Sequence, residues 1–290
     1  MSPAPLLELQ AVDHVFADGS SGLRACSLAL ARGRRHALLG ANGAGKTTVL
    51  QHLNGLLRPG AGRVLWDGRA LDYGRAGLSA LRRHVGLVFQ NPDRQLFSAL
   101  VEEDVSFGPL NMGLDAATVR SRVAAALDAV DMAAHARRPL HHLSFGQKKR
   151  VCLAGVLAME PDVLLLDEPM AGLDAPMQAD LTRLLDRQAA RGVTVLLSTH
   201  DIDFAYGWAD DLHLMAAGRC IGSGPTATLA RQGELLRAAG QRTPVALALH
   251  SQLAERGVLP AGAALRSIEA VLGALGAPRH PHDDSMRTTT

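Results

Sequence analysis

The chain has 290 residues, of which 47% are hydrophobic, and its formal net charge at pH 7 is +2. This apolar content can bury a core, so global disorder is excluded, and the balanced charge lacks the basic excess of a dedicated nucleic-acid-binding protein. Cys26, Cys152 and Cys220 lie far apart without a C-x-x-C pair, so we expect small core thiols in a reducing compartment rather than disulfides or zinc ligands.

Short apolar runs alternate with helical patterns through the first two thirds of the chain. Residues 35–39 predict a strand that runs into glycines, and residues 47–57 predict a helix with one apolar face. A second strand is expected at 85–89, and apolar residues recur at helical spacing over 102–136.

The alternation continues after Pro161. Residues 163–166 are wholly apolar, which is typical of a buried parallel strand. Residues 177–191 predict an amphipathic helix closed by Gly192, and residues 193–197 predict another buried strand. This order predicts an α/β fold with a parallel sheet and crossover helices.

Three further segments complete the expected organisation. Residues 92–158 contain no such strand, so we expect a helical subdomain inserted into the sheet. Two short helices at 244–256 and 263–275 predict a small C-terminal helical extension over 241–276. Residues 277–290 are polar and contain prolines, which predicts a disordered tail.

Residues 40–48 read GANGAGKTT and match the phosphate-binding pattern G-x-x-x-x-G-K-[ST]. The pattern lies between a predicted strand and a predicted helix, which argues against an ordinary Gly-rich turn. We expect Lys46 to reach the β- and γ-phosphates and Thr47 to ligate Mg²⁺. The chain's only lysines are Lys46, Lys148 and Lys149, which hints that arginine does not serve at these positions. The residues assigned to nucleotide binding are Gly40, Ala41, Asn42, Gly43, Ala44, Gly45, Lys46, Thr47 and Thr48.

Two carboxylates, Asp167 and Glu168, follow the apolar run at 163–166. Ligands bind at the carboxyl ends of parallel strands, so we expect Asp167 to hold the magnesium ion and Glu168 to act on the attacking water. Alone, the pair could simply end a strand and begin a turn; the phosphate-binding loop in the same chain favours the catalytic interpretation.

Residues 143–147 read LSFGQ ahead of a helical run. Ser144 and Gln147 have the spacing of a capping box, so an ordinary helix start would explain them. The segment also resembles the signature of the ABC ATPase family, usually LSGGQ, with Phe145 in place of the first glycine. This resemblance implies that Ser144, Gly146 and Gln147 approach the γ-phosphate of an ATP held by another subunit.

Other residues fall where the same family has functional positions. Phe16 resembles its adenine-stacking aromatic residue, although a core residue of an N-terminal strand would look the same. Gln90 resembles the Q-loop glutamine and Asp174 the D-loop aspartate. His200 resembles the switch histidine, although a lone histidine is more often structural. The resemblance, which covers about residues 6–240, implies ATP and Mg²⁺ as cofactors, with Gln90 near the metal and acting in catalysis together with Glu168 and His200.

The branch of the family is indicated by FQNPDRQLF at 89–97, VEEDVSFGP at 101–109 and LSFGQKKR at 143–150. These stretches resemble the ATPases of energy-coupling-factor importers, most of all the single-ATPase cobalt and nickel systems. An importer of a vitamin or another solute is the alternative, because metal selectivity would lie in a separate membrane subunit. Less fitting are a conventional ABC importer or exporter, a non-transport ABC protein acting on ribosomes or DNA, and a P-loop kinase.

The partners are inferred from the same pattern. No apolar run reaches the roughly 18–20 residues that span a bilayer, and residues 1–10 lack the features of a signal peptide. We therefore expect a peripheral protein on the cytoplasmic face of the membrane, bound to integral membrane subunits and not to nucleic acid. All motifs are intact, so a homodimer is expected, although a heterodimer is compatible with the sequence.

The stretch from Gln90 to Pro109 is expected to couple the nucleotide to a membrane subunit. Phe97, Val105 and Phe107 could form an apolar surface for a partner's helix. The alternative is that these side chains belong to the core of the helical subdomain.

Overall fold

The computed structural model describes residues 5–263 and 265–276; the expected tail at 277–290 lies outside the described residues. A six-stranded sheet at its centre has the strand order β10-β9-β3-β8-β7-β6. Five strands run parallel, and β10 is antiparallel to β9 at one edge. The strands are β3 (Arg35–Gly40), β6 (Val85–Val88), β7 (Val163–Leu166), β8 (Thr194–Thr199), β9 (Asp211–Ala216) and β10 (Arg219–Pro225).

β6 and β7 are buried along their whole length, which is why neither strand carries a polar side chain. Along β7, Val163 and Leu165 pack into one hydrophobic core, whereas Leu164 and Leu166 pack into the other. The alternation follows from the period of two along a strand. The expected α/β fold with a largely parallel sheet is confirmed.

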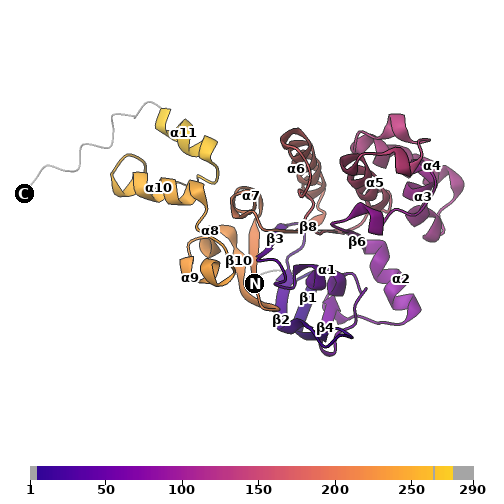
Figure 1. Ribbon diagram of the computed structural model, residues 1–290, viewed down its shortest axis with the longest axis horizontal. Coiled ribbons are helices and arrows are strands. Elements are labelled where there is room, and N and C mark those ends of the chain that lie inside the picture. The colour runs from indigo at the N-terminus through magenta and orange to yellow at the C-terminus, as the bar shows by residue number, and fades with distance from the viewer. Residues whose placement is uncertain (1–4, 264, 277–290) are drawn as a thin grey trace, which may run out of the picture.

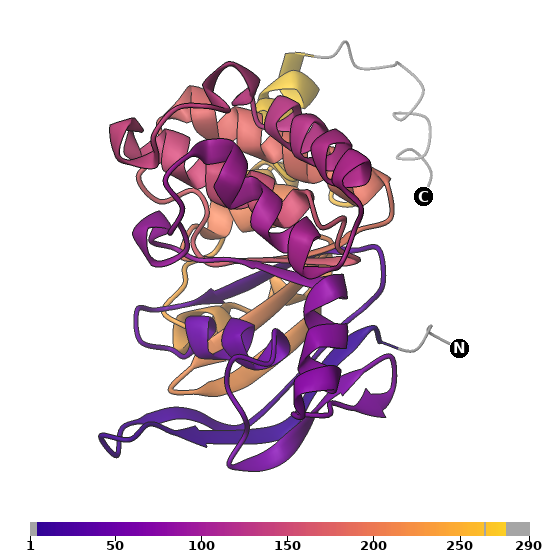
Figure 2. The same ribbon diagram turned by 90° about the vertical axis from the view of Figure 1, so that its right-hand side faces the viewer.

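One face is covered by a second, antiparallel sheet and by α1 (Lys46–Leu53), whereas the helical region and α6 (Ala175–Ala190) cover the other face (Figures 1 and 2). The sequence patterns did not predict the antiparallel sheet. Its strands, in the order β2-β1-β4-β5, are β2 (Ser21–Leu30), β1 (Leu7–Val15), β4 (Ala61–Trp66) and β5 (Arg69–Ala70).

The helix after the phosphate-binding loop is shorter than predicted. Instead of reaching residue 57, α1 ends at Leu53, with Asn54 as its C-cap. Gly55 follows with φ +68°, a left-handed conformation that ends a helix at little cost when the residue is glycine. α2 (Arg75–His84), which was not predicted, then leads into β6.

Residues 92–158 are helical, and α3, α4 and α5 gather at one end of the molecule (Figure 1). The long pattern at 102–136 is divided by Gly113, which has φ +77°, and continues in α4 and a 3-10 turn. The elements are η1 (Pro92–Arg94), α3 (Val101–Asn111), α4 (Ala116–Ala129), η2 (Ala133–His135), η3 (Leu140–His142) and α5 (Phe145–Leu157).

The last helices lie at the opposite end of the molecule (Figure 1). Within the described residues, no helix is both long enough and apolar enough to cross a bilayer. The boundaries proposed at 6–240 and 241–276 stay predictions. The remaining helices are α7 (Ile202–Trp208), α8 (Thr226–Leu229), α9 (Gly233–Ala238), α10 (Val245–Glu255) and α11 (Ile268–Gly276).

Two imidazoles are buried between β3 and β9. His36 Nδ1 lies 3.2 Å from His213 Nε2, His36 Nε2 lies 3.1 Å from the Ala31 carbonyl oxygen, and His213 Nδ1 lies 2.7 Å from Ser223 Oγ. One assignment of tautomers satisfies every contact with both rings neutral: each Nε2–H donates, and the Ser223 hydroxyl donates to His213. Burial, followed by the proximity of His36, lowers the pKa of His213 to about 3.

Candidate active site

The loop between β3 and α1 is shaped to wrap around an anion. Gly43 and Gly45 have φ values of +78° and +101°, a left-handed conformation that suits glycine. At Gly40, a Cβ would lie 2.7 Å from the Met215 carbonyl oxygen, so a larger residue would force β3 and β9 apart. Gly45 is the N-cap of α1, and the first N–H groups of that helix have no carbonyl partner within it. Phosphate oxygens can accept from these groups.

Lys46 lies across the mouth of this loop. Its Nζ donates to the carbonyl oxygens of Gly40 at 2.7 Å and Ala41 at 3.3 Å, and lies 3.5 Å from Glu168 Oε1. A compact ammonium can face these three oxygens at once, whereas a planar guanidinium needs more room. The phosphate-binding role of Lys46 stays a prediction, and this position supports it.

Thr47 and Asp167 place two oxygen atoms side by side next to the loop. Thr47 Oγ1 donates to Asp167 Oδ2 at 2.7 Å, and Ser198 Oγ donates to Asp167 Oδ1 at 2.7 Å. Hydroxyl and carboxylate oxygens are the hard ligands that Mg²⁺ prefers. The residues therefore fit a magnesium ion held by Thr47 and Asp167, with Ser198 orienting the carboxylate. Such an ion, when bound, neutralises phosphate charge.

Glu168 is held in an uncommon backbone conformation directly after β7. Its φ is +44°, in the left-handed region that residues with a side chain seldom adopt, and its N–H donates to Ser198 Oγ at 2.8 Å. The carboxylate lies 3.1 Å from His200 Nδ1 through Oε2 and 3.5 Å from Lys46 Nζ through Oε1. A carboxylate held between two basic groups at a cavity can accept a proton from a water molecule.

These groups line one cavity of about 850 Å³. Phe16 forms part of its wall, and its ring packs edge-on against His14 with 4.7 Å between the centroids. Phe16 is exposed rather than part of the core, which argues against the core interpretation. The predicted residues at the cavity are Phe16, Ala41, Asn42, Gly43, Ala44, Gly45, Lys46, Thr47, Thr48, Gln90, Asp167, Glu168 and His200.

Five other cavity residues were not predicted: Ser21, Gly22, Ala171, Gly240 and Gln241. A Cβ at Gly22 would come within 2.8 Å of the Phe16 ring, so this glycine leaves room for the aromatic wall. A glycine inside a strand pattern was the available signal for that close approach. Gly240 and Gln241 follow α9, and nothing in their local pattern points to a nucleotide.

Ser144, Gly146, Gln147 and Asp174 do not line this cavity. Ser144 and Gln147 form the predicted capping box at the start of α5: the N–H of Gln147 donates to Ser144 Oγ at 3.3 Å, and that of Ser144 donates to Gln147 Oε1 at 3.0 Å. Asp174 caps α6 through the Met177 N–H. A single chain therefore does not bring these four residues to the cavity.

The segment after Gln90 is fastened to α5. The Gln95 side chain donates to the Cys152 carbonyl oxygen at 3.1 Å, and Lys148 Nζ donates to Asp93 Oδ1 at 2.7 Å. Much of the FQNPDRQ stretch therefore serves to hold the residues that follow Gln90 against this helix.

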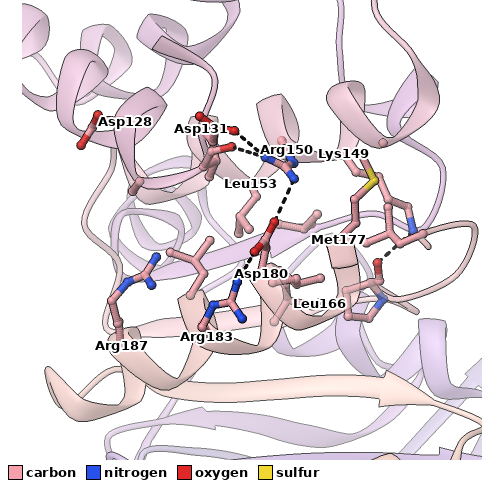
Figure 3. Close-up of a pocket in the computed structure, with 18 of the residues that line it drawn as sticks. Asp128, Asp131, Lys149, Arg150, Leu153, Leu166, Met177, Asp180, Arg183 and Arg187 are labelled. Atoms are coloured by element: carbon pink, nitrogen blue, oxygen red, sulfur yellow. Dashed lines mark hydrogen bonds and ion pairs between the residues drawn. The ribbon is translucent and has the colours of Figure 1, made fainter. Parts of the chain in front are cut away.

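A second pocket, of about 370 Å³, lies between α5 and α6 (Figure 3). Leu153, Leu166 and other apolar side chains line it. At its edge Arg150 of α5 lies 3.3 Å from Asp180 Oδ2 of α6 and 3.4 Å from Oδ2 of Asp131, which follows α4. The pocket extends to the loop that carries Glu168, since Pro169 is among the residues that line the pocket.

Comparison with known proteins identifies the family. The ABC transporter family matches over residues 23–171. The chain is 43% identical over 239 residues to the energy-coupling factor transporter ATP-binding protein EcfA of Methanothermobacter thermautotrophicus, which covers 82% of this chain and 77% of that protein. It is 47% identical over 245 residues to the cobalt import ATP-binding protein CbiO of Rhodobacter capsulatus, covering 84% and 88% of the two chains.

Solved structures show the same relationship. CbiO1 from Clostridium perfringens, described as part of the ABC transporter complex cbiONQ, superposes with a TM-score of 0.71 at 42% identity and covers 81% of this chain and 94% of its own. A dimeric ATP-binding cassette in a post-hydrolysis state with ADP and phosphate gives 0.70 at 26% identity, over 76% and 98%. A P-loop kinase is thereby excluded. The chain belongs to the ABC transporter family, as an ATP-hydrolysing subunit similar to the ATPases of energy-coupling-factor transporters.

Proposed function

We propose that this subunit couples ATP hydrolysis to the uptake of a transition-metal ion, cobalt or nickel, through separate integral membrane subunits. Support comes from the similarity to a cobalt import protein and to a component of the cbiONQ complex. The relative named for an energy-coupling factor specifies no solute, so uptake of a vitamin or another solute is the second candidate. All three names favour transport over a role on ribosomes or DNA.

The observation that best supports a membrane partner is an exposed aromatic pair beside the Gln90 segment. Phe97 and Phe107 are 62% and 50% exposed, yet their rings pack edge-on with 4.6 Å between the centroids. The Asp104 carboxylate accepts the N–H groups of Phe97 and Ser98, each at 3.0 Å. The pair is thus presented by a fixed backbone, as suits an anchor for a partner's helix.

The structure corrects one member of this predicted surface. Val105 is fully buried in the core of the helical region, so it cannot face a partner. For Phe97 and Phe107 the core interpretation is wrong, because both rings are largely exposed. The surface we propose therefore consists of Phe97 and Phe107.

Two copies of the chain are proposed to form the active unit at the cytoplasmic face of the membrane. The cavity of one copy contains Lys46 and Glu168 but not Ser144 or Asp174. A second copy can supply the N-terminus of its α5, whose unpaired N–H groups suit a phosphate. A similar cassette forms a dimer with ADP and phosphate, which supports this arrangement.

Within each site, hydrolysis proceeds by attack of water on the γ-phosphorus. Glu168 accepts a proton from that water as its oxygen bonds to phosphorus, and the bond to the β–γ bridging oxygen breaks to give ADP and phosphate. His200 orients the Glu168 carboxylate, and Lys46 with the loop N–H groups stabilises the phosphate charge.

Purification of the tagged chain from detergent-solubilised membranes tests the proposal. We expect it to copurify with integral membrane subunits, and cells that contain this complex should take up radioactive cobalt or nickel in an ATP-dependent manner. Uptake of a vitamin instead would favour the second candidate, and copurification with ribosomes or DNA would refute transport.

Phe97→Ala tests the partner surface. Because the ring is exposed, the isolated subunit should keep its melting temperature and its ATP affinity but lose copurification and uptake. Leu56→Ala, at another exposed apolar residue (45% exposed), is the control and should retain both copurification and uptake. A destabilised Phe97→Ala protein that still transports would contradict the assignment.

A further inference from the structure

A buried lysine joins α5 to the loop that carries Glu168. Lys149 lies in the first two turns of α5, two residues after the end of the signature segment at Gln147. Its Nζ donates to three main-chain carbonyl oxygens: Glu168 at 3.3 Å, Pro169 at 3.1 Å and Ala171 at 2.6 Å. An ammonium has three N–H donors, so the three acceptors satisfy it. Figure 3 shows Lys149 near Met177, at one end of the pocket between α5 and α6.

Lys149 supplies the hydrogen-bond donor at the centre of this loop. The carbonyl oxygens of Glu168, Pro169 and Ala171 face one point, and Lys149 is only 7% exposed, so bulk water cannot replace it. Buried carbonyl groups without a donor are costly. Glu168 also has a positive φ, a conformation that persists where surrounding contacts enforce it.

Burial lowers the pKa of Lys149, and the attraction of Glu168 offsets this only in part. The Phe145 ring lies 5.4 Å from its Nζ and also covers Gly172, where a Cβ would lie 2.9 Å from the ring. Phe145, Lys149 and the loop therefore pack as one unit, and Phe145 is the residue that departs from the usual LSGGQ signature.

We propose that Lys149 is a positioning residue for hydrolysis: it fixes the main chain of residues 168–171 and thereby keeps the Glu168 carboxylate between Lys46 and His200. The inference rests on the proposed role of Glu168. Without Lys149, the Glu168 carbonyl oxygen keeps only the Ala171 N–H as a donor, and those of Pro169 and Ala171 lose the ammonium. The loop can then shift and displace the Glu168 carboxylate, whereas the phosphate-binding loop is unchanged. Turnover should therefore fall while ATP binding persists.

The test compares Lys149→Met and Lys149→Arg with the unmodified full chain. We expect kcat to fall on the order of 10- to 100-fold in both variants, the range that a misplaced catalytic group can cost. Arginine should fail because its N–H groups lie in one plane and cannot converge on three carbonyl oxygens. The dissociation constant of fluorescent ATP should stay within about threefold of the parental value, since ground-state binding is separate from turnover.

Arg187→Met is the matched control. Arg187 is an exposed cation of α6 at the far end of the same pocket from Lys149 (Figure 3). Removing its charge leaves the loop contacts intact, so kcat should stay at the parental value. An equal loss of kcat in Arg187→Met would overturn the positioning role, because charge in the pocket would then be the cause.

A double-mutant cycle separates positioning from general stabilisation. If Lys149 acts through Glu168, then Lys149→Met should cost little more in a Glu168→Gln background, as single-turnover phosphate release would show. An equal loss in that background, or parental kcat in Lys149→Met, would overturn the inference. If Glu168→Gln itself is fully active, the general-base assignment fails, and this inference fails with it.

A second variant is used if the first one does not fold. Should Lys149→Met not fold, Lys149→Gln, which keeps amide N–H donors, takes its place in the cycle with the same expectations. If neither variant folds, Lys149 stabilises the whole subunit, and the positioning role is refuted.

Discussion

Replacing Glu168 with glutamine keeps the shape of the side chain and removes one charge and one proton acceptor. Its carboxylate lies 3.1 Å from His200 and 3.5 Å from Lys46, so the amide can occupy the same place. A positioned general base contributes roughly 10²- to 10⁴-fold to a rate, which corresponds to about 2.7–5.5 kcal/mol of barrier height. We expect turnover to fall by about 10²-fold or more.

ATP binding should survive the same change. The Glu168 side chain is only 11% exposed, and two opposite charges 3.5 Å apart attract each other by roughly 5 kcal/mol at an effective dielectric of about 20, before desolvation is subtracted. The substitution releases Lys46 from this attraction and removes a negative charge near the expected γ-phosphate. The dissociation constant for ATP should therefore be unchanged or lower.

Phosphate release measures turnover, and titration with fluorescent ATP measures binding. Glu255→Gln, at an exposed carboxylate of α10, is the matched control and should retain parental values of both. A Glu168→Gln protein that hydrolyses ATP at the parental rate would refute the role we assign to Glu168. Thermal unfolding of each variant excludes a loss of folding as the cause.

Three further predictions concern affinity, pH and assembly. Lys46→Arg should weaken ATP binding, because the planar guanidinium does not fit the mouth of the loop; parental affinity in an ATP titration would contradict that geometry. Stability should decrease as the pH falls below about 6.5, because a histidine in the unfolded chain takes up a proton at its ordinary pKa of 6.5, whereas His213, with a pKa of about 3, stays neutral in the fold. Urea unfolding between pH 7.5 and 5 measures the free energy of unfolding at each pH. In His213→Gln this free energy should change less steeply with pH; an unchanged pH dependence would show that other groups cause it. With saturating ATP and magnesium, Glu168→Gln should dimerise at micromolar concentration in light scattering, and a monomer under these conditions would count against the homodimer.

The central sheet could be predicted because its strands are buried on both faces. The runs at 163–166 and 193–197 are continuously apolar, and no other local pattern explains them so simply. The antiparallel sheet gave no such signal. In β1 the pairing register with β2 shifts between Leu9 and Val12, and Ala11 has a positive φ. These bulges interrupt the period of two on which strand prediction depends.

Some residues of the candidate site could likewise be predicted from the sequence, and others could not. Residues that follow a strand, such as Asp167 and His200, could be predicted together because parallel strands end at one edge of the sheet. Gln241 and Lys149 reach the site through tertiary packing, so their local sequence could not show it. Only the scarcity of lysine in the chain marked Lys149 as unusual.

For the two lysines that contact the site, geometry explains why the residue is lysine rather than arginine. Arg34 meets Asp211 through two nitrogens, at 2.6 and 3.0 Å, which is the fork geometry that suits a guanidinium. Lys46 and Lys149 instead face several oxygens that converge on one point, and only an ammonium can serve there. The exposed Lys148 contact with Asp93 does not share this requirement.

The adjacent lysines of α5 also connect the two proposals. Lys148 fastens this helix to the segment after Gln90, and Lys149 fastens it to the loop of Glu168. Phe97 lies a few residues beyond the Gln90 segment, on the same helical region. A partner that moves this region relative to the central sheet must therefore act on both loops at once, or break the contacts that join them to α5. Coupling by this route requires two arrangements of α5 that the nucleotide and the partner favour differently, and Lys148 and Lys149 are the contacts through which each would be sensed.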